Sequence, residues 1–309
     1  MLLSFVIPCY RSERTIKKVV DEIIATVSMR SSYDYEIIAI NDCSPDHVYE
    51  ILKEMASENK KIKVINLAKN MGKHAAVLAG YAAVRGQYIV NLDDDFQCPV
   101  YELWKLLEPV EKDECDYATA RYFVKKQSAM KNFGSNVNLH MSEILLKKPK
   151  GLRFENFSVM KRFVCDEIVK YKNPYPYLEG LILRVTFRIK AVPMDERQRG
   201  DELETGFTFR KSFALLVDGL TAFSVKPLRI AAFMGCLFAV FGFILGFYIV
   251  IRKCLDPKVL IGYSSLAAIL LFSSGLIMLM LGMIGEYVGR IYICLNDSPQ
   301  YVIRETINL

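Results

Sequence analysis

Three adjacent carboxylates, Asp93, Asp94 and Asp95, are the residues in this chain whose chemistry most needs an explanation. They follow an apolar run, Tyr88–Leu92, that predicts a short buried strand, and Pro99 prevents that strand from continuing. Neighbouring negative charges repel, so a fold keeps them together at a strand end only with something positive nearby. Ligand sets made of oxygen alone favour Mg²⁺ or Mn²⁺, which commonly binds together with substrate phosphates. The alternative is a solvated acidic turn that caps the next helix.

The segments around this cluster alternate between expected strands and expected helices. Apolar runs predict strands over residues 2–7, 36–40 and 62–66, and amphipathic spacing predicts helices over residues 16–28, 48–58 and 74–84. Further strands are expected over residues 116–121, 181–189 and 191–193. Polar residues gather where the early strands stop. This order predicts a doubly wound α/β sheet that binds its ligand beyond the carboxyl ends of the strands.

Composition and missing motifs narrow the function. The chain has neither GxGxxG nor GxxxxGK[ST], which argues against a dinucleotide cofactor and against a P-loop. A net charge of +6 over 309 residues is too mild to indicate nucleic-acid binding. The eight Cys have no zinc-like spacing and fit reduced thiols in the cytosol. The three His, at positions 47, 74 and 140, share no ligand spacing, and the N-terminal apolar run is too short for a signal peptide.

The C-terminal third changes character. Residues 230–251 and 259–285 carry no charge, and the first run is long enough to span about 33 Å as a helix, which crosses a hydrocarbon core. Two spans return the chain to the side from which it started, and a cytosolic catalytic domain would place both termini in the cytosol. We therefore divide the chain into a cytosolic domain (1–208), a juxtamembrane amphipathic helix (209–229), two transmembrane helices (230–290) and a cytosolic tail (291–309).

Several short motifs occur in an order that resembles the family-2 glycosyltransferases of the polyprenyl-phosphate type, such as dolichol-phosphate mannose synthase and the bactoprenol glucosyltransferases. The matching segments are Val6–Tyr10 with Glu13, Asn41–Asp46, Asn70–Lys73, Asp93–Pro99, Phe223–Arg229 and Gly285–Tyr287. The resemblance covers essentially the whole chain. It implies a GT-A-like, Rossmann-type nucleotide-sugar domain followed by a two-helix transmembrane hairpin.

The same resemblance implies roles for individual residues. The implied nucleotide-binding residues are Pro8, Tyr10, Glu13, Asp42, Lys73, Asp93 and Asp94, with Asp42 reading the base and Lys73 meeting the diphosphate. The implied ligands of Mg²⁺ or Mn²⁺ are Asp93, Asp95 and Gln97, with Asp95 as the main ligand. Asp93, Asp95 and Arg121 are the implied catalytic residues, and Arg121 would steady a phosphate.

The implied reaction is inverting transfer of one sugar from a nucleotide sugar, most simply a UDP-sugar, to undecaprenyl phosphate beside the membrane lipids. The product would be a polyprenyl-monophosphate-sugar that donates to cell-envelope glycans. Two alternatives stay open: a processive membrane polysaccharide synthase, although Trp104 does not lie in a QxxRW motif, and a catalytically silent membrane scaffold. The family often has Asp-Phe-Arg where this chain has Asn156-Phe157-Ser158, which fits an acceptor that needs no base. The sugar, the lipid length, any homo-oligomer and an acceptor contact by Arg197 or Arg199 stay open.

Overall fold

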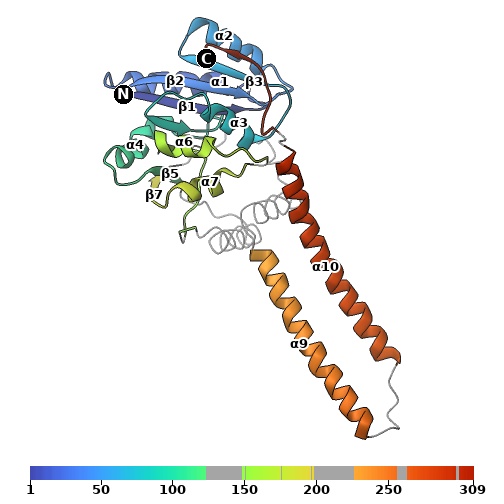
Figure 1. Ribbon diagram of the computed structural model, residues 1–309. Helices are drawn as coiled ribbons and strands as arrows, with labels where there is room; N and C mark the ends of the chain where they lie inside the picture. Colours follow the sequence, from blue (N-terminus) through green and yellow to red (C-terminus); the bar gives the residue numbers. More distant parts are fainter. Residues whose placement is uncertain are drawn as a thin grey trace. The chain divides into compact units, whose positions relative to one another are not determined.

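The computed structural model describes residues 1–122, 148–149, 151–174, 176–195, 197, 226–255, 263–296 and 299–309 (Figure 1). The chain divides into two compact units. Unit 1 consists of Met1–Ser212 together with Asp297–Leu309, and unit 2 is Phe213–Asn296. Unit 2 is thus an insertion in the chain between the two parts of unit 1.

Unit 1 is built on one eight-stranded sheet with the order β7-β5-β6-β4-β1-β2-β3-β8. The strands are β1 (Leu2–Cys9), β2 (Asp34–Asn41), β3 (Ile62–Leu67), β4 (Tyr88–Asn91), β5 (Tyr117–Tyr122), β6 (Ser158–Lys161), β7 (Ile189–Met194) and β8 (Ile303–Ile307). Strands β1 to β4 are parallel to one another and β7 is parallel to β5, whereas β6 is antiparallel to β4 and β5. The expected doubly wound α/β sheet is thus present, with two antiparallel strands, β6 and β8, that the sequence did not predict.

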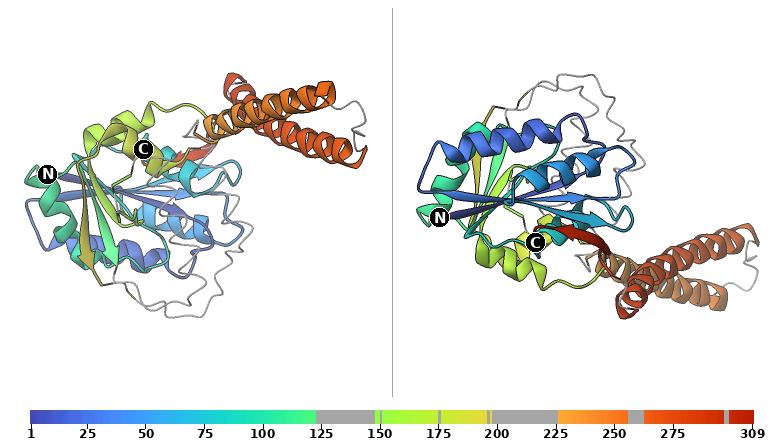
Figure 2. Two further views of the ribbon diagram at one scale, coloured as in Figure 1. Left: turned by 90° about the horizontal axis from the view of Figure 1, so that it is seen from below. Right: turned by 90° about the horizontal axis from the view of Figure 1, so that it is seen from above.

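Helices cover both faces of this sheet. They are α1 (Ile16–Ser28), α2 (Val48–Glu58), α3 (Lys73–Tyr81), the 3-10 turn η1 (Val100–Glu102), α4 (Leu103–Glu111), α6 (Arg162–Val169) and α7 (Leu178–Val185). Alternate side chains of β1, such as Phe5 and Ile7, join a core with α1, α2 and α4. On the other face, α3 packs so closely that a Cβ at Gly80 would lie 2.5 Å from Val6 Cγ1. Figure 2 (left) shows α1 in blue and α6 in yellow-green on opposite faces of the sheet.

A buried ion pair joins the parallel strands near their amino-terminal ends. Glu36 of β2 and Lys63 of β3 are 4% and 6% exposed, and Lys63 Nζ lies 2.6 Å from Glu36 Oε2. The Ser4 hydroxyl of β1 donates to Glu36 Oε1 at 2.5 Å, and the backbone N–H of Gly86, just before β4, donates to Ser4 Oγ at 2.7 Å. A Cβ at Gly86 would lie 2.5 Å from Ser4 Oγ and 2.7 Å from a backbone oxygen, so this turn needs glycine.

The chain reverses direction across the sheet between β1 and β4. From β1 it runs through α1 to β2 on one side, and from β3 it returns through α3 to β4 on the other side of β1. Ligands of open α/β sheets bind at such a switch point, beyond the carboxyl ends of the strands. Tyr10 follows β1 here, and Asp93–Asp95 follow β4.

The last strand, β8, returns to the sheet after unit 2 and pairs antiparallel with β3. Several side-chain contacts hold this segment in place. Gln300 Nε2 donates to the carbonyls of Tyr171 and Asn173 at 2.9 and 2.7 Å, and Asn308 Nδ2 donates to the carbonyls of Ala56 and Ile62 at 2.7 and 2.9 Å. The sequence predicted only a tail for residues 291–309, because a five-residue edge strand with polar neighbours carries little periodic signal.

One expected strand is wrong. Residues 181–189 were expected to be a strand, but Leu178–Val185 forms the helix α7 and β7 begins only at Ile189. The helix buries Leu181, Ile182 and Leu183. A short apolar run does not distinguish a buried strand from one or two turns of buried helix, and packing against α6 decides between them here.

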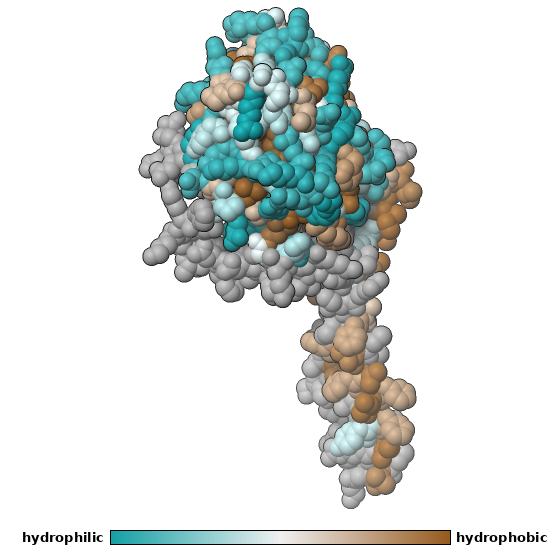
Figure 3. Space-filling view, turned by 90° about the vertical axis from the view of Figure 1, so that its left-hand side faces the viewer, coloured by the Kyte–Doolittle hydropathy of each residue, from teal (hydrophilic) through white to brown (hydrophobic). Residues whose placement is uncertain are grey.

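Unit 2 contains two long apolar helices, α9 (Lys226–Leu255) and α10 (Tyr263–Leu295). They contact each other through the rings of Phe238 and Phe272, whose centroids lie 5.5 Å apart. Among the residues that the structure describes, one helical segment, Phe272–Leu295, is long and apolar enough to cross a membrane. Figure 3 shows largely hydrophobic residues along the described part of this hairpin and largely hydrophilic ones on the visible face of unit 1. Most of the juxtamembrane helix expected over 209–229 lies outside the described residues.

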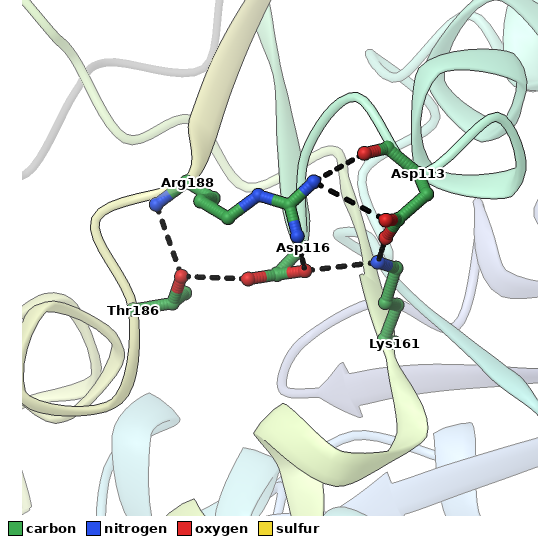
Figure 4. A network of polar contacts seen from close by, with 5 residues as sticks. All are labelled: Asp113, Asp116, Lys161, Thr186 and Arg188. Atoms are coloured by element: carbon green, nitrogen blue, oxygen red, sulfur yellow. Dashed lines mark hydrogen bonds and ion pairs between the residues drawn. The ribbon is translucent and has the colours of Figure 1, made fainter.

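A polar network at the start of β5 ties together the outer part of the sheet (Figure 4). Asp116, 6% exposed, accepts hydrogen bonds from Lys161 Nζ and Thr186 Oγ1, both at 2.9 Å, and pairs with Arg188 Nη1 at 3.5 Å. Asp113, which is exposed, pairs with the same two cations. The buried carboxylate therefore links β5 to the end of β6 and the loop before β7.

We predict that Asp116→Ala lowers the free energy of unfolding by about 2–4 kcal/mol, because it removes the shared acceptor of three donors. The matched control Asp113→Ala removes an exposed carboxylate from the same network and should cost less than about 1 kcal/mol. Denaturant unfolding of the full chain in detergent can be followed by fluorescence, since the single Trp, Trp104, lies on α4 of unit 1. Equal losses for the two variants would contradict the importance of the buried carboxylate.

Candidate functional site

The loops after β1 and β4 meet at the switch point. The backbone N–H of Tyr10 donates to Asp94 Oδ2 at 2.9 Å, so the middle carboxylate of the acidic run points back to the end of β1. Burial raises the pKa of Asp94 to about 6, although the hydrogen bond from the Tyr10 N–H and the nearby Ser12 hydroxyl act in the opposite direction. The Tyr10 side chain is 44% exposed beyond this contact. Asp94 therefore joins the two loops, and Tyr10 presents an aromatic ring at their junction.

The loop after β2 joins the same edge. Ser44 Oγ accepts a hydrogen bond from the backbone N–H of Arg11 at 2.8 Å. Glu13 Oε2 accepts from the backbone N–H of His47 at 3.1 Å, while Asp46 Oδ2 accepts from the backbone N–H of Glu13 at 3.0 Å. These reciprocal bonds give Glu13 a position between the loops after β1 and β2. Pro8, which was also expected at the nucleotide pocket, lies buried in β1 opposite Ile40.

Asp42 is only 3% exposed and holds the loop that leads into α3. Its Oδ1 accepts the backbone N–H of Met71 at 2.8 Å and its Oδ2 accepts that of Gly72 at 2.9 Å. Burial raises the pKa of Asp42, and these two hydrogen bonds lower it in part. The structure thus places Asp42 beside Lys73, the first residue of α3, as a support for the basic loop.

Asp93 has a protein donor on each carboxylate oxygen. The ammonium of Lys73 pairs with Oδ1, and the side-chain amide of Asn156 donates to Oδ2 at 2.5 Å. The positive charge that the acidic run requires is therefore supplied by Lys73. The contact with Asn156 was not foreseen, because this residue lies far from Asp93 in the sequence and in a loop without a periodic signal.

Arg197, which lies outside the strands of the sheet, contacts the loop that carries Asp95. Asp95 Oδ1 accepts the backbone N–H of Gln97 at 3.1 Å. The Arg197 guanidinium lies 4.1 Å from the Phe96 ring centroid and donates to the Phe96 carbonyl at 3.3 Å. Both of its terminal nitrogens pair with Glu22 of α1 at 2.9 Å. Arg197, considered above for an acceptor contact, thus clamps the acidic loop to α1, and Arg199 lies outside the described residues.

A left-handed backbone conformation recurs in the three loops. Arg11, Cys43 and Phe96 have φ angles of 58°, 50° and 63°, and each directly follows a residue discussed above, Tyr10, Asp42 or Asp95. Non-glycine residues rarely adopt this conformation, and such residues concentrate at functional sites. None of the three is a residue type that predicts a positive φ from sequence.

Arg121 lies near the end of β5, at the same sheet edge as the acidic run, and its side chain is exposed. Strand β6 separates β5 from β4, so Arg121 stands two strand positions from Asp93. The structure brings Tyr10, Asp42, Lys73 and Asp93 into one connected set of loops and leaves Arg121 at their border.

The carboxylate oxygens of Asp93 and Asp95, in the loop after β4, are suitable ligands for a hard divalent cation. In the part of the chain that the structure describes, no group of three His, Cys, Asp or Glu side chains is arranged to hold a metal ion. Mg²⁺ and Mn²⁺ in sites that also bind phosphate commonly use one or two carboxylates, with substrate phosphates and water completing the coordination. Asp95 and Asp93 supply such carboxylates, so the residues present fit a metal that binds together with its substrate.

His74 gives a testable pH dependence. Its ring centroid lies 5.9 Å from that of Tyr177, and burial, followed by the charge of Lys73, lowers its pKa to about 4. Between pH 6.5 and 4 the folded protein therefore binds fewer protons at this site than the unfolded chain, so stability falls as the pH falls.

We predict that His74→Gln reduces the loss of unfolding free energy between pH 7 and pH 5 by about 1–2 kcal/mol. Trp104 fluorescence in denaturant titrations measures it, and an unchanged loss would contradict the burial of a neutral His74.

The matched control is His47→Gln. His47 is exposed on the loop before α2. Its replacement should leave the loss of unfolding free energy between pH 7 and pH 5 the same as in the parent chain.

The chain is similar to known proteins over most of its length. The chain matches the family model described as Glycosyl transferase family 2 over residues 4–169, and the model described as GtrB C-terminal hairpin over residues 226–291. It is 33% identical over 314 residues to the uncharacterized glycosyltransferase YkcC of Bacillus subtilis (strain 168), covering 99% of this chain and 94% of that protein. It is 27% identical over 316 residues to the undecaprenyl-phosphate 4-deoxy-4-formamido-L-arabinose transferase of Photorhabdus laumondii, covering 99% and 94%.

A solved structure shows the same fold. Glucosyl-3-phosphoglycerate synthase from Mycobacterium tuberculosis, in complex with Mn²⁺, uridine diphosphate and glucosyl-3-phosphoglycerate, superimposes with a TM-score of 0.51 at 19% identity, covering 70% of this chain and 76% of that chain. The likeness confirms the GT-A-like α/β fold expected for unit 1. The hairpin match indicates that the protein associates with a membrane. Since the family model covers more than half of the chain and YkcC is related over nearly all of it, the chain belongs to the family-2 glycosyltransferases.

Proposed function

We propose that this glycosyltransferase moves one sugar from a nucleoside-diphosphate sugar to undecaprenyl phosphate, with inversion at the anomeric carbon. The observation that carries the proposal is the meeting of Tyr10, Lys73 and the acidic run at one sheet edge. The full-length relationship to undecaprenyl-phosphate sugar transferases supports the acceptor. The donor nucleotide is most simply UDP, which a protein of the same fold binds together with Mn²⁺.

The donor half of the site follows from the chemistry of its residues. The exposed ring of Tyr10 can stack on a base, and Lys73 provides a cation for the diphosphate next to Asp93. A divalent metal held by Asp95 and Asp93 would neutralise charge that develops on the leaving diphosphate. Asp42 acts on the donor through the loop at residues 71–73, whose backbone it fixes, in addition to the proposed reading of the base.

The acceptor needs little activation. A lipid phosphate is ionised at neutral pH, so one of its oxygens can form the bond to the anomeric carbon while the bond to the nucleoside diphosphate breaks. Asn156 stands where the family often has an acid, and its amide cannot accept a proton as a carboxylate would. We therefore assign no general base to this position. Arg121 remains the proposed phosphate contact at the border of the site.

Chain connectivity supports a hairpin with two crossings. Unit 1 contains residues both before and after unit 2, because β8 completes its sheet. A segment that leaves and re-enters one folded unit crosses a bilayer an even number of times. We propose that α9 and α10 each cross once, that 226–255 and 263–295 contain the two spans, and that the catalytic unit and both termini are cytosolic.

A transfer assay tests the function. Membranes that contain the protein are incubated with Mn²⁺, a panel of nucleotide sugars and undecaprenyl phosphate, and the lipid product is extracted and its anomeric configuration determined. We expect one inverted polyprenyl-monophosphate-sugar, no product with undecaprenol, and loss of product when a chelator removes the metal. Equal transfer to undecaprenol would overturn the proposed acceptor, and retention of configuration would overturn the proposed mechanism.

We predict that Asp95→Ala lowers transfer by about 10²–10³-fold, because the metal loses its main ligand and charge on the leaving diphosphate is no longer neutralised. The variant should still insert into membranes, which fractionation checks. Asp21→Ala removes an exposed carboxylate on α1 and serves as the control. Near-normal transfer by Asp95→Ala in the presence of Mn²⁺ would show that the metal assignment is wrong.

A further inference from the structure

Asn156 occupies a loop that the rest of unit 1 holds in place on both sides. The next residue, Phe157, is fully buried in the core, and its carbonyl accepts the backbone N–H of Ala120 at 2.9 Å. The preceding residue, Glu155, donates its backbone N–H to Thr119 Oγ1 at 3.0 Å. The position of Asn156 is thus determined by strand β5 and by the core.

A second strand fixes Asn156 directly. The side-chain amide of Asn91, the last residue of β4, donates to the carbonyl of Asn156 at 3.1 Å. Asn91 is also two residues before Asp93, so one strand supports both ends of the contact between Asn156 and Asp93. The backbone of Asn156 is thus held beside Asp93, and the exposed side-chain amide donates to Asp93 Oδ2 from this position.

The contact completes the surroundings of Asp93. Lys73 occupies Oδ1 and Asn156 Nδ2 lies 2.5 Å from Oδ2, so both oxygens have a donor and the plane of the carboxylate is set. Asn156 achieves this without a charge. A cationic side chain in place of Asn156 would compete with a metal ion for Asp93. A carboxylate in place of Asn156 would repel the carboxylate of Asp93.

We propose that Asn156 is a positioning residue: by its hydrogen bond to Asp93 it orients that carboxylate toward the metal and diphosphate of the donor. The inference rests on the proposed function, since it assumes that Asp93 serves the metal–diphosphate group. Hydrogen-bond partners of metal-binding side chains commonly contribute tenfold or more to metal affinity, which sets the size of the effect.

The test measures Mn²⁺ affinity in the presence of UDP by calorimetry on the full chain in detergent. Five variants are compared with the parent chain: Asn156→Ala, Asn156→Gln, Asp93→Ala, the double variant of Asp93→Ala with Asn156→Ala, and the control Asn59→Ala. The side-chain amide of Asn59, in the loop before β3, donates a hydrogen bond to the Tyr35 hydroxyl at 3.1 Å. This contact lies near the amino-terminal ends of β2 and β3, away from the carboxyl ends that carry Asp93. Thermal unfolding is recorded for each protein so that a general loss of structure is separated from a local effect.

We expect Asn156→Ala to weaken Mn²⁺ binding by about tenfold with an unfolding temperature close to that of the parent chain, and Asn59→Ala to leave the affinity unchanged. In the Asp93→Ala background, Asn156→Ala should have no further effect, because Asn156 acts through Asp93. Asn156→Gln, which retains an amide donor, should recover part of the loss.

Two outcomes separate this inference from the proposed function. The positioning role is wrong, and the metal site stands, if Asp93→Ala weakens Mn²⁺ binding but Asn156→Ala does not. The same conclusion follows if Asn156→Ala weakens Mn²⁺ binding as much in the Asp93→Ala background as in the parent chain. If Asp93→Ala leaves Mn²⁺ binding unchanged, the metal assignment of Asp93 fails and the role of Asn156 fails with it.

Discussion

The buried carboxylate of Glu36 is the constraint on which the sheet of unit 1 depends. It contacts Ser4 on β1, Lys63 on β3 and the backbone N–H groups of Arg85 and Gly86 before β4. Burial raises its pKa, but the Lys63, Ser4 and Arg85 contacts outweigh burial, so the pKa of Glu36 is lowered overall. A buried charge of this kind tolerates no missing partner, which restricts how the strands can slide past one another.

This constraint has its effect at the other end of the strands. Because β1, β2 and β4 are held in register near their beginnings, their carboxyl ends deliver Tyr10, Asp42 and Asp93 to one edge. The loops there use backbone N–H groups to hold carboxylates, as in the contacts of Asp94 with Tyr10 and of Asp42 with Met71. Such donors are part of the fold and need no rearrangement when a ligand arrives.

Much of this arrangement could be predicted from sequence, because its signals are local. The alternation of strands with helices predicted the α/β fold, and the acidic run after a buried strand predicted the end of the sheet at which we propose that the reaction takes place. The partners of the acidic run could not be predicted in the same way. Asn156 and Arg197 reach Asp93 and Phe96 from distant loops, and only the packed sheet brings them close. Strand β6 and helix α7 were missed for a related reason, since short apolar runs take their conformation from what they pack against.

The pairing of β8 with β3 has a consequence for biosynthesis. β8 is translated after both helices of the hairpin, so β3 has no partner on its outer side while the hairpin is being made. An open strand edge is a template for pairing with other chains. The nascent protein therefore leaves this strand edge unpaired until β8 has been made, so the sheet of unit 1 can be completed only after both helices of the hairpin have been synthesised.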